Sequence, residues 1–90
     1  MQVIKIGAVW CSTCLVMRPR WQQIEDKYSW LKTKYFDYDQ DQAQIEPYQI
    51  NSQRLPVFII LDKQGQEIER LDGELSLAEI DQLVLKYKHK

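Results

Sequence analysis

The chain has 90 residues, of which 44% are hydrophobic and 28% are charged, and its net charge is −1 at pH 7. This composition is typical of a folded globular protein, and a chain of this length buries about 60–65% of its unfolded surface. We therefore expect one domain over residues 1–90. The near-zero charge, with a basic cluster only at the C-terminal end, argues against a nucleic-acid partner.

No targeting segment is recognisable. Residues 1–6 are too short and too charged for a signal peptide, and the longest apolar run, residues 57–61, is too short to cross a bilayer. The sequence therefore predicts a cytoplasmic monomer with no membrane partner. The two cysteines are three positions apart, and in a reducing compartment such a pair is more often chemical than structural.

The first elements predicted are a strand and a helix. Residues 2–9 are a β-branched, mostly apolar run that is typical of a buried strand. After a turn around residues 10–12, apolar side chains recur every three or four positions, which predicts a helix over about residues 12–29. Pro19 lies inside this helix and should kink it, because proline removes one helical hydrogen bond.

The middle of the chain predicts two strands separated by irregular structure. Residues 33–38 alternate and carry aromatic side chains, as a strand does. Residues 39–41 can cap a short helix over about residues 42–48, and residues 51–54 should form a loop. The β-branched run at residues 57–61 predicts the most clearly defined strand.

The last third predicts a hairpin and a helix. Gly65 supplies a positive φ in a turn, after which residues 66–71 return as a weaker strand near the sheet edge. Gly73 marks another turn, and Ser76 with Glu79 forms a capping box that begins the final helix. The order βαβαββα combines helical crossovers with one tight turn, so we expect an α/β fold with a four-stranded mixed sheet flanked by helices.

Cys11 and Cys14 occupy the first turn of a predicted helix, directly after a strand. A helix N-terminus offers unpaired N–H groups and about half a positive charge, which both favour a thiolate. Because the spacing puts both sulfurs on one side of the turn, one thiol can attack a disulfide and the other can resolve the mixed disulfide. This context favours redox chemistry over an inert pair. A metal or iron–sulfur site would need further ligands, so we expect no metal and no cofactor.

Several motifs resemble those of the thioredoxin family, over nearly the whole chain. Trp10–Cys14, with Pro19 shortly after, is similar to the family's active site and kinked helix. Leu55–Val57 resembles the apolar–proline–apolar segment that faces the cysteines, Asp37–Asp39 resembles the end of the next strand, and Gly73 resembles the glycine before the last helix. The family's N-terminal strand and helix are absent, so the resemblance is to a short form, with a thioredoxin-like fold.

The resemblance implies a role for each site residue. Cys11 is the exposed nucleophile and Cys14 the buried resolving thiol, in an enzyme that reduces the disulfides of protein substrates and takes electrons from a thioredoxin reductase-type donor. An extended substrate peptide should lie against the backbone beside a cis Leu55–Pro56 bond. The residues implied to shape or bind the substrate are Trp10, Leu55, Pro56 and Gly73.

The site also departs from the family pattern. The central dipeptide is Ser12–Thr13, whose hydroxyls could bond a thiolate, and Gly7 replaces an aromatic residue. Lys5 stands where the family usually has a buried acid, and we expect it to be coupled to the dithiol. A charged lysine would stabilise a Cys14 thiolate, and a neutral one could take its proton. We favour a third arrangement, an ion pair with Asp37, because an unpaired buried ammonium is costly.

Two other functions stay open. A glutaredoxin-like, glutathione-dependent reductase ranks lower because Gly73–Glu74 lacks the paired glycines and following aspartate of that group. The other alternative is a redox-inactive binding module of thioredoxin fold, which would show no cysteine-dependent turnover.

Overall fold

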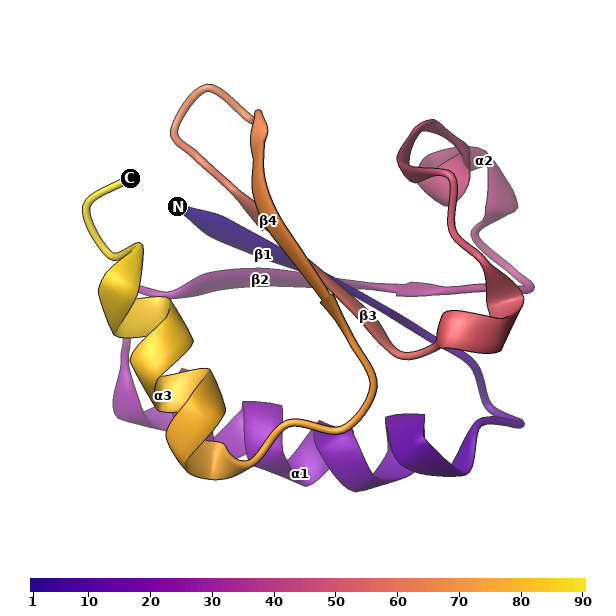
Figure 1. Cartoon of the computed structure of the whole chain (residues 1–90), viewed down its shortest axis with the longest axis horizontal. Coiled ribbons are helices and arrows are strands. Elements are labelled where there is room, and N and C mark those ends of the chain that lie inside the picture. Colours follow the sequence, from indigo (N-terminus) through magenta and orange to yellow (C-terminus); the bar gives the residue numbers. More distant parts are fainter.

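The computed structural model describes residues 1–90, and its elements follow the predicted order. They are β1 (Gln2–Gly7), α1 (Ser12–Lys27), β2 (Lys32–Asp37), α2 (Gln42–Ile45), the 3₁₀ turns η1 (Glu46–Tyr48) and η2 (Ser52–Arg54), β3 (Val57–Leu61), β4 (Glu67–Asp72) and α3 (Leu77–Lys86) (Figure 1). The first strand and the first helix each end slightly earlier than predicted. The strand stops because the chain turns at residues 8–11, where the backbone N–H of Cys11 donates to the carbonyl of Ala8 at 3.2 Å.

The four strands form one mixed sheet in the order β2-β1-β3-β4, which confirms the expected sheet and the edge position of β4. β1 is parallel to β2 and antiparallel to β3. The register places Lys5 beside Tyr35 of β2 and Gly7 beside Asp37. Because side chains alternate along a strand, Lys5 and Gly7 share the face of Val3, which packs with α1.

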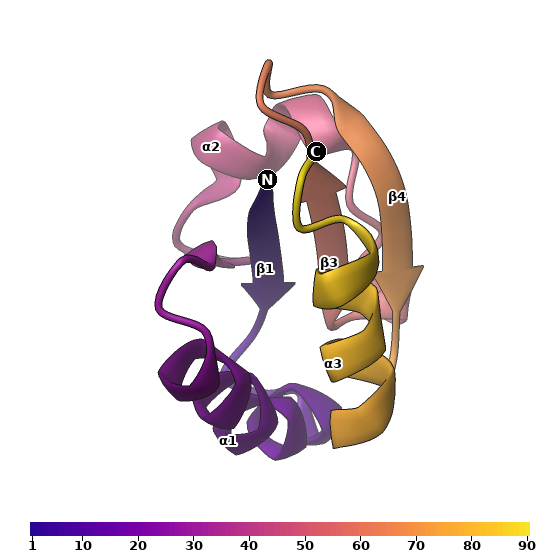
Figure 2. The same ribbon diagram turned by 90° about the vertical axis from the view of Figure 1, so that its left-hand side faces the viewer.

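Helices cover the two faces of the sheet unequally. α1 and α3 lie on one side and α2 lies on the other (Figures 1 and 2). The core on the first side includes Met17 and Trp21 of α1 and Ile80 of α3. The smaller core on the second side contains Ile45 of α2. All five residues of β3 are buried, because its alternate side chains enter both cores. None of the helices is both long and apolar enough to span a membrane.

The helix starts are only partly as predicted. The capping box of α3 is confirmed, with both reciprocal bonds between Ser76 and Glu79. Asp41 is the N-cap residue of α2, but its carboxylate does not cap that helix; it accepts a bond from the backbone N–H of Asp37 at 2.8 Å. The predicted helix over 42–48 is a single α-helical turn continued by η1, and the predicted loop at 51–54 contains η2. Gly65 has the expected positive φ of 81°.

Candidate active site

Cys11 caps the N-terminus of α1. Its sulfur accepts a hydrogen bond from the backbone N–H of Cys14 at 3.2 Å. This N–H belongs to the first helical turn, where backbone N–H groups have no partner within the helix. Both cysteines are free thiols; Cys11 is partly exposed, whereas Cys14 is 4% exposed. The expected contrast in exposure is therefore present, and the helix terminus offers electrostatic stabilisation to a thiolate at Cys11.

Cys14 faces the sheet from the first turn of α1, with Met17 and Trp21 further along the same buried stripe. Burial, reinforced by the hydrogen bond with Cys11, raises the pKa of the Cys14 thiol to about 12. A hydrogen bond with the backbone of Ala8 and the charge of Arg18 act in the opposite direction. At neutral pH Cys14 is therefore a protonated thiol in the reduced protein.

The predicted proline segment lies against the buried thiol. The Leu55–Pro56 bond is cis, as expected. Pro56 and Cys14 line the same small cavity, of about 30 Å³, and the backbone N–H of Gly73 donates to the carbonyl of Pro56 at 2.9 Å. Gly73, at φ 83°, is thus joined to the proline turn, whereas Leu55 is partly buried and packs against the core on the α2 side.

Trp10 is held by the segment that follows β2. Its indole N–H donates to the carboxylate of Asp39 at 2.7 Å, and its ring meets the Tyr38 ring edge-on, with 6.5 Å between centroids. The side chain is still 56% exposed, so it lies at the surface next to Cys11. The sequence interpretation gave neither Tyr38 nor Asp39 a role in the site. The signal was available, because β1 and β2 are parallel and their carboxyl ends meet at one edge of the sheet.

Lys5 lies beneath the dithiol, but its predicted partner was wrong. It lines the Cys14 cavity, and its ammonium contacts the Glu25 carboxylate of α1 at 2.6 Å rather than Asp37. The register places Asp37 opposite Gly7, and its carboxylate accepts bonds from the backbone N–H groups of residues 39 and 40. Strand alternation directs Lys5 toward α1, where Glu25 is the available carboxylate.

The remaining residues near the thiols contribute in different ways. Ser12 is exposed and Thr13 is partly buried, and the structure shows no hydrogen bond from either hydroxyl to a sulfur. Gly7 is tightly enclosed: a β-carbon added there would lie 3.1 Å from the Tyr35 hydroxyl and 3.2 Å from the Cys14 sulfur. Neither the role of Tyr35 nor this close approach was predicted from the sequence.

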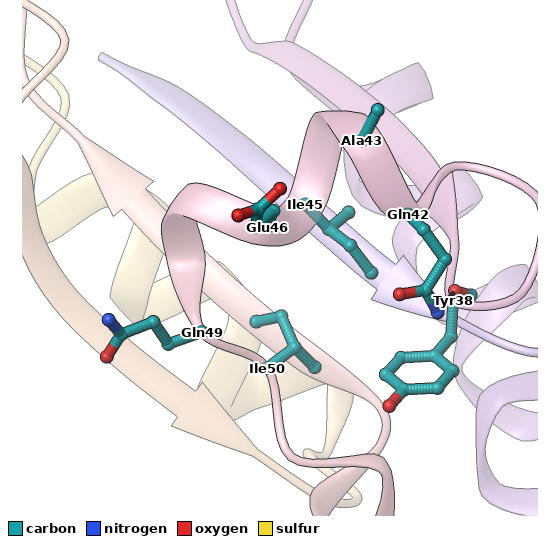
Figure 3. A pocket seen from close by; sticks show the side chains of 7 residues that line it. All are labelled: Tyr38, Gln42, Ala43, Ile45, Glu46, Gln49 and Ile50. Carbon is teal, nitrogen blue, oxygen red and sulfur yellow. Dashed lines mark hydrogen bonds between the residues drawn. The ribbon is translucent and has the colours of Figure 1, made fainter.

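A larger hollow, of about 350 Å³, lies on the α2 side of the sheet. Figure 3 shows that Ile45, Ile50 and Tyr38 gather around it, while Gln49 points away. Neither cysteine borders this hollow, and Tyr38, which lines it, contacts Trp10 of the site. The chemistry therefore belongs to the smaller cavity at Cys14. No cluster of three or more His, Cys, Asp or Glu side chains is placed to hold a metal ion.

The fold and site define a class of α/β protein in which a dithiol at a helix N-terminus lies against a cis-proline turn. The family model for thioredoxin matches residues 1–86. The chain is 37% identical over 84 residues to Thioredoxin H7 of Arabidopsis thaliana, covering 93% of this chain and 60% of that protein. It is 34% identical to Thioredoxin H-type of Fagopyrum esculentum, over 79% of this chain and 59% of that one.

Solved structures agree with these matches. Thioredoxin NaTrxh from Nicotiana alata superposes with a TM-score of 0.79 at 28% identity, covering 96% of this chain and 73% of that chain. The chain therefore belongs to the thioredoxin family, as the sequence motifs indicated. It spans about three fifths of the length of the two plant relatives.

Proposed function

We propose that this chain is a protein-disulfide reductase that works through a mixed disulfide on Cys11. The observation that carries the proposal is the contrast between two neighbouring thiols. Cys11 is accessible and receives a helix N–H, while Cys14 is buried beneath it with a pKa of about 12. The attacking species in a thiol–disulfide exchange is a thiolate, so this arrangement favours Cys11 as the first nucleophile.

The reaction then has two exchange steps. The Cys11 thiolate attacks one sulfur of the substrate disulfide, forming a Cys11–substrate bond and releasing the second substrate sulfur as a thiolate, which takes a proton from water. Cys14 next loses its proton to water and attacks the Cys11 sulfur. This forms the Cys11–Cys14 disulfide and releases the first substrate sulfur, so two electrons pass to the substrate. A thioredoxin reductase-type donor restores the dithiol.

The substrate segment is proposed to lie across Trp10 and the Pro56–Gly73 contact, with Leu55 supporting the turn from below. Trp10 and its neighbour Val9 are exposed, and so is Leu15 on the first turns of α1. These exposed apolar side chains lie within four positions of Cys11 along the chain, which favours an extended protein segment over a small hydrophilic disulfide. The same surface gives less support to the glutathione-dependent alternative.

Lys5, paired with Glu25, is proposed to influence the ionisation of the buried Cys14 thiol. It shares the cavity with Cys14, and its side chain is 17% exposed. The Glu25 contact largely cancels its charge at a distance, so its effect on Cys14 should be moderate. Ser12 and Thr13 are proposed to set the reduction potential through the backbone of the first helical turn.

Reduction of a protein disulfide with dithiothreitol as electron source tests the function. We expect the parent chain to accelerate the reaction and Cys11→Ser to give only the rate of dithiothreitol alone. A parent chain with no acceleration would identify a redox-inactive binding module. Turnover that glutathione sustains better than a thioredoxin reductase would favour the glutaredoxin-like alternative. We place the activity in the cytoplasm, where thiols stay reduced.

A further inference from the structure

Two further polar side chains, those of Arg18 and Tyr35, line the Cys14 cavity together with Lys5. Arg18 follows Cys14 by one helical turn on α1, and Tyr35 comes from β2. The Arg18 guanidinium donates a 3.4 Å hydrogen bond to the Tyr35 hydroxyl, and its central carbon lies 5.3 Å from the centre of the Tyr35 ring. Both side chains line the cavity that contains the thiol. The arginine therefore holds the tyrosine by its ring and by its oxygen.

The Tyr35 hydroxyl and the Cys14 sulfur border the same point beside Gly7. A β-carbon on Gly7 would lie within 3.2 Å of both atoms, which means that only a glycine leaves them this close to the β1 backbone. Because the guanidinium donates to the phenol oxygen, the phenol proton remains free to donate elsewhere. A thiolate at Cys14 is a nearby acceptor for that proton.

We propose that Tyr35 stabilises the Cys14 thiolate by hydrogen-bond donation during the resolving step, and that Arg18 is the positioning residue that orients Tyr35. This inference rests on the proposed dithiol reaction and adds two residues to it. In the step, Cys14 gives its proton to water, the Tyr35 O–H holds the thiolate, and the thiolate attacks the Cys11 sulfur. The Cys11–substrate bond breaks, and the substrate sulfur leaves as a thiolate that is then protonated by water.

The other charged groups around Cys14 leave this role open. Lys5 of β1 lines the cavity, and its charge is neutralised by Glu25 of α1. The Cys11 thiol, which helps to raise the pKa of Cys14 in the reduced protein, is no longer a thiol in the mixed disulfide. Arg18 then remains with its positive charge and its link to Tyr35, and Asp37 acts on Arg18 rather than on the sulfur.

The reaction of the reduced protein with 5,5′-dithiobis(2-nitrobenzoate) separates the two thiols. The first release of the coloured thiolate reports attack by Cys11, and the second reports attack by Cys14 on the mixed disulfide. We expect Tyr35→Phe to slow the second phase about threefold near pH 7 and to leave the first phase unchanged. A thiol pKa raised by about one unit gives about tenfold less thiolate, of which higher nucleophilicity recovers about threefold.

Three further variants separate a chemical role of Tyr35 from a packing role. Tyr28→Phe also removes a hydroxyl bonded to a charged side chain, that of Asp81, but at the far end of α1, and it should leave both phases at the parent rate. Arg18→Met should slow the second phase, and Arg18→Lys should restore part of the rate because it keeps the charge.

Each outcome decides between the two proposals. If the parent shows no second phase, the dithiol reaction itself fails. If the parent shows it and Tyr35→Phe matches the parent in the rate of both phases, Tyr35 has no such role. Equal slowing of both phases would reduce Tyr35 to a packing role and overturn the inference.

Discussion

The two thiols are three residues apart, yet their surroundings are built in different ways. Cys11 depends on the local chain: it caps α1 and accepts the N–H of Cys14. Cys14 depends on distant elements, because its cavity is lined from β1, α1, β2 and the proline turn before β3. One helix turn therefore places a partly exposed sulfur by local geometry and a buried sulfur whose protonation is set by tertiary structure.

The largest expected effect breaks this asymmetry directly. Cys14→Ser should accumulate a covalent mixed disulfide with a protein substrate, because Cys11 still attacks and nothing resolves the product. Cys11→Ser should accumulate none, since the remaining thiol is buried and protonated. Non-reducing electrophoresis and mass spectrometry of the two variants, mixed with the same oxidised substrate, measure the difference. The opposite pattern would mean that the roles of the two cysteines are reversed.

What was predictable from the sequence follows the same division. The element order, the capping box at Ser76 and the turn at Gly65 depend on neighbours a few positions away, and all three are present. Helix periodicity also placed Cys14 on the buried stripe. The cis Leu55–Pro56 bond came from the resemblance to the family and not from local patterns.

The missed features all depend on how distant segments meet. Asp37 was a reasonable partner for Lys5 on an adjacent strand, but the register places it opposite Gly7, where it accepts bonds from the next turn, and Lys5 pairs with Glu25 instead. Tyr35 approaches Cys14 only because Gly7 leaves space beside it. A glycine in place of an aromatic residue was noticed in the sequence. Which side chain would occupy the freed space depends on strand pairing, which periodicity does not specify.

The next-largest effect concerns the Lys5–Glu25 ion pair and its contribution to stability. Glu25→Ala removes the carboxylate from a lysine whose side chain is only 17% exposed, so we expect a loss of about 2 kcal/mol in the free energy of unfolding. Urea denaturation measures it. Asp26→Ala is the matched control, because Asp26 is exposed and its carboxylate bonds only the Gln22 amide. Equal stabilities for the two variants would show that the Lys5–Glu25 contact adds nothing to folding.

Lys5→Met tests whether the same pair reaches the dithiol. Removing the ammonium leaves the Glu25 carboxylate without its partner, and an uncompensated negative charge on the helix that carries Cys14 disfavours a thiolate there. We expect the pH profile of disulfide reduction to move to higher pH, with a rate about threefold lower near neutrality. Coinciding profiles and coinciding Cys14 titrations in the parent and the variant would remove Lys5 from the site.

A smaller effect connects the buried thiol to stability at high pH. The pKa of Cys14 is raised from 9.0 to about 12 by burial, so above pH 9 the unfolded chain binds fewer protons than the folded one at this group. Stability must then fall as the pH rises through this range. Cys14→Ala lacks this dependence, and the difference in unfolding free energy between parent and variant should shrink by about 1 kcal/mol between pH 8 and pH 10. A constant difference would contradict the raised pKa.

The smallest effect concerns the hydrogen bond between Trp10 and Asp39, on the exposed side of the dithiol. Asp39→Ala removes the acceptor of the Trp10 indole N–H, a 2.7 Å bond between exposed groups, so stability should fall by less than about 1 kcal/mol. The effect on substrate binding should be larger than this small loss of stability suggests, because Trp10 no longer keeps one orientation beside Cys11. We expect kcat/KM for a protein disulfide to fall about threefold through KM, since the thiols themselves are untouched.

Glu46→Ala is the matched control for this variant. It removes one negative charge from another exposed position, and the indole N–H bonds Asp39 rather than Glu46. The control should keep the parent KM, and the stopped-flow rate of Cys11 with a small disulfide should be the same in all three proteins. A KM change shared by both variants would assign the effect to net charge. A slower Cys11 reaction in Asp39→Ala alone would instead show that the carboxylate acts on the thiol, and that the exposed side, too, depends on a distant element.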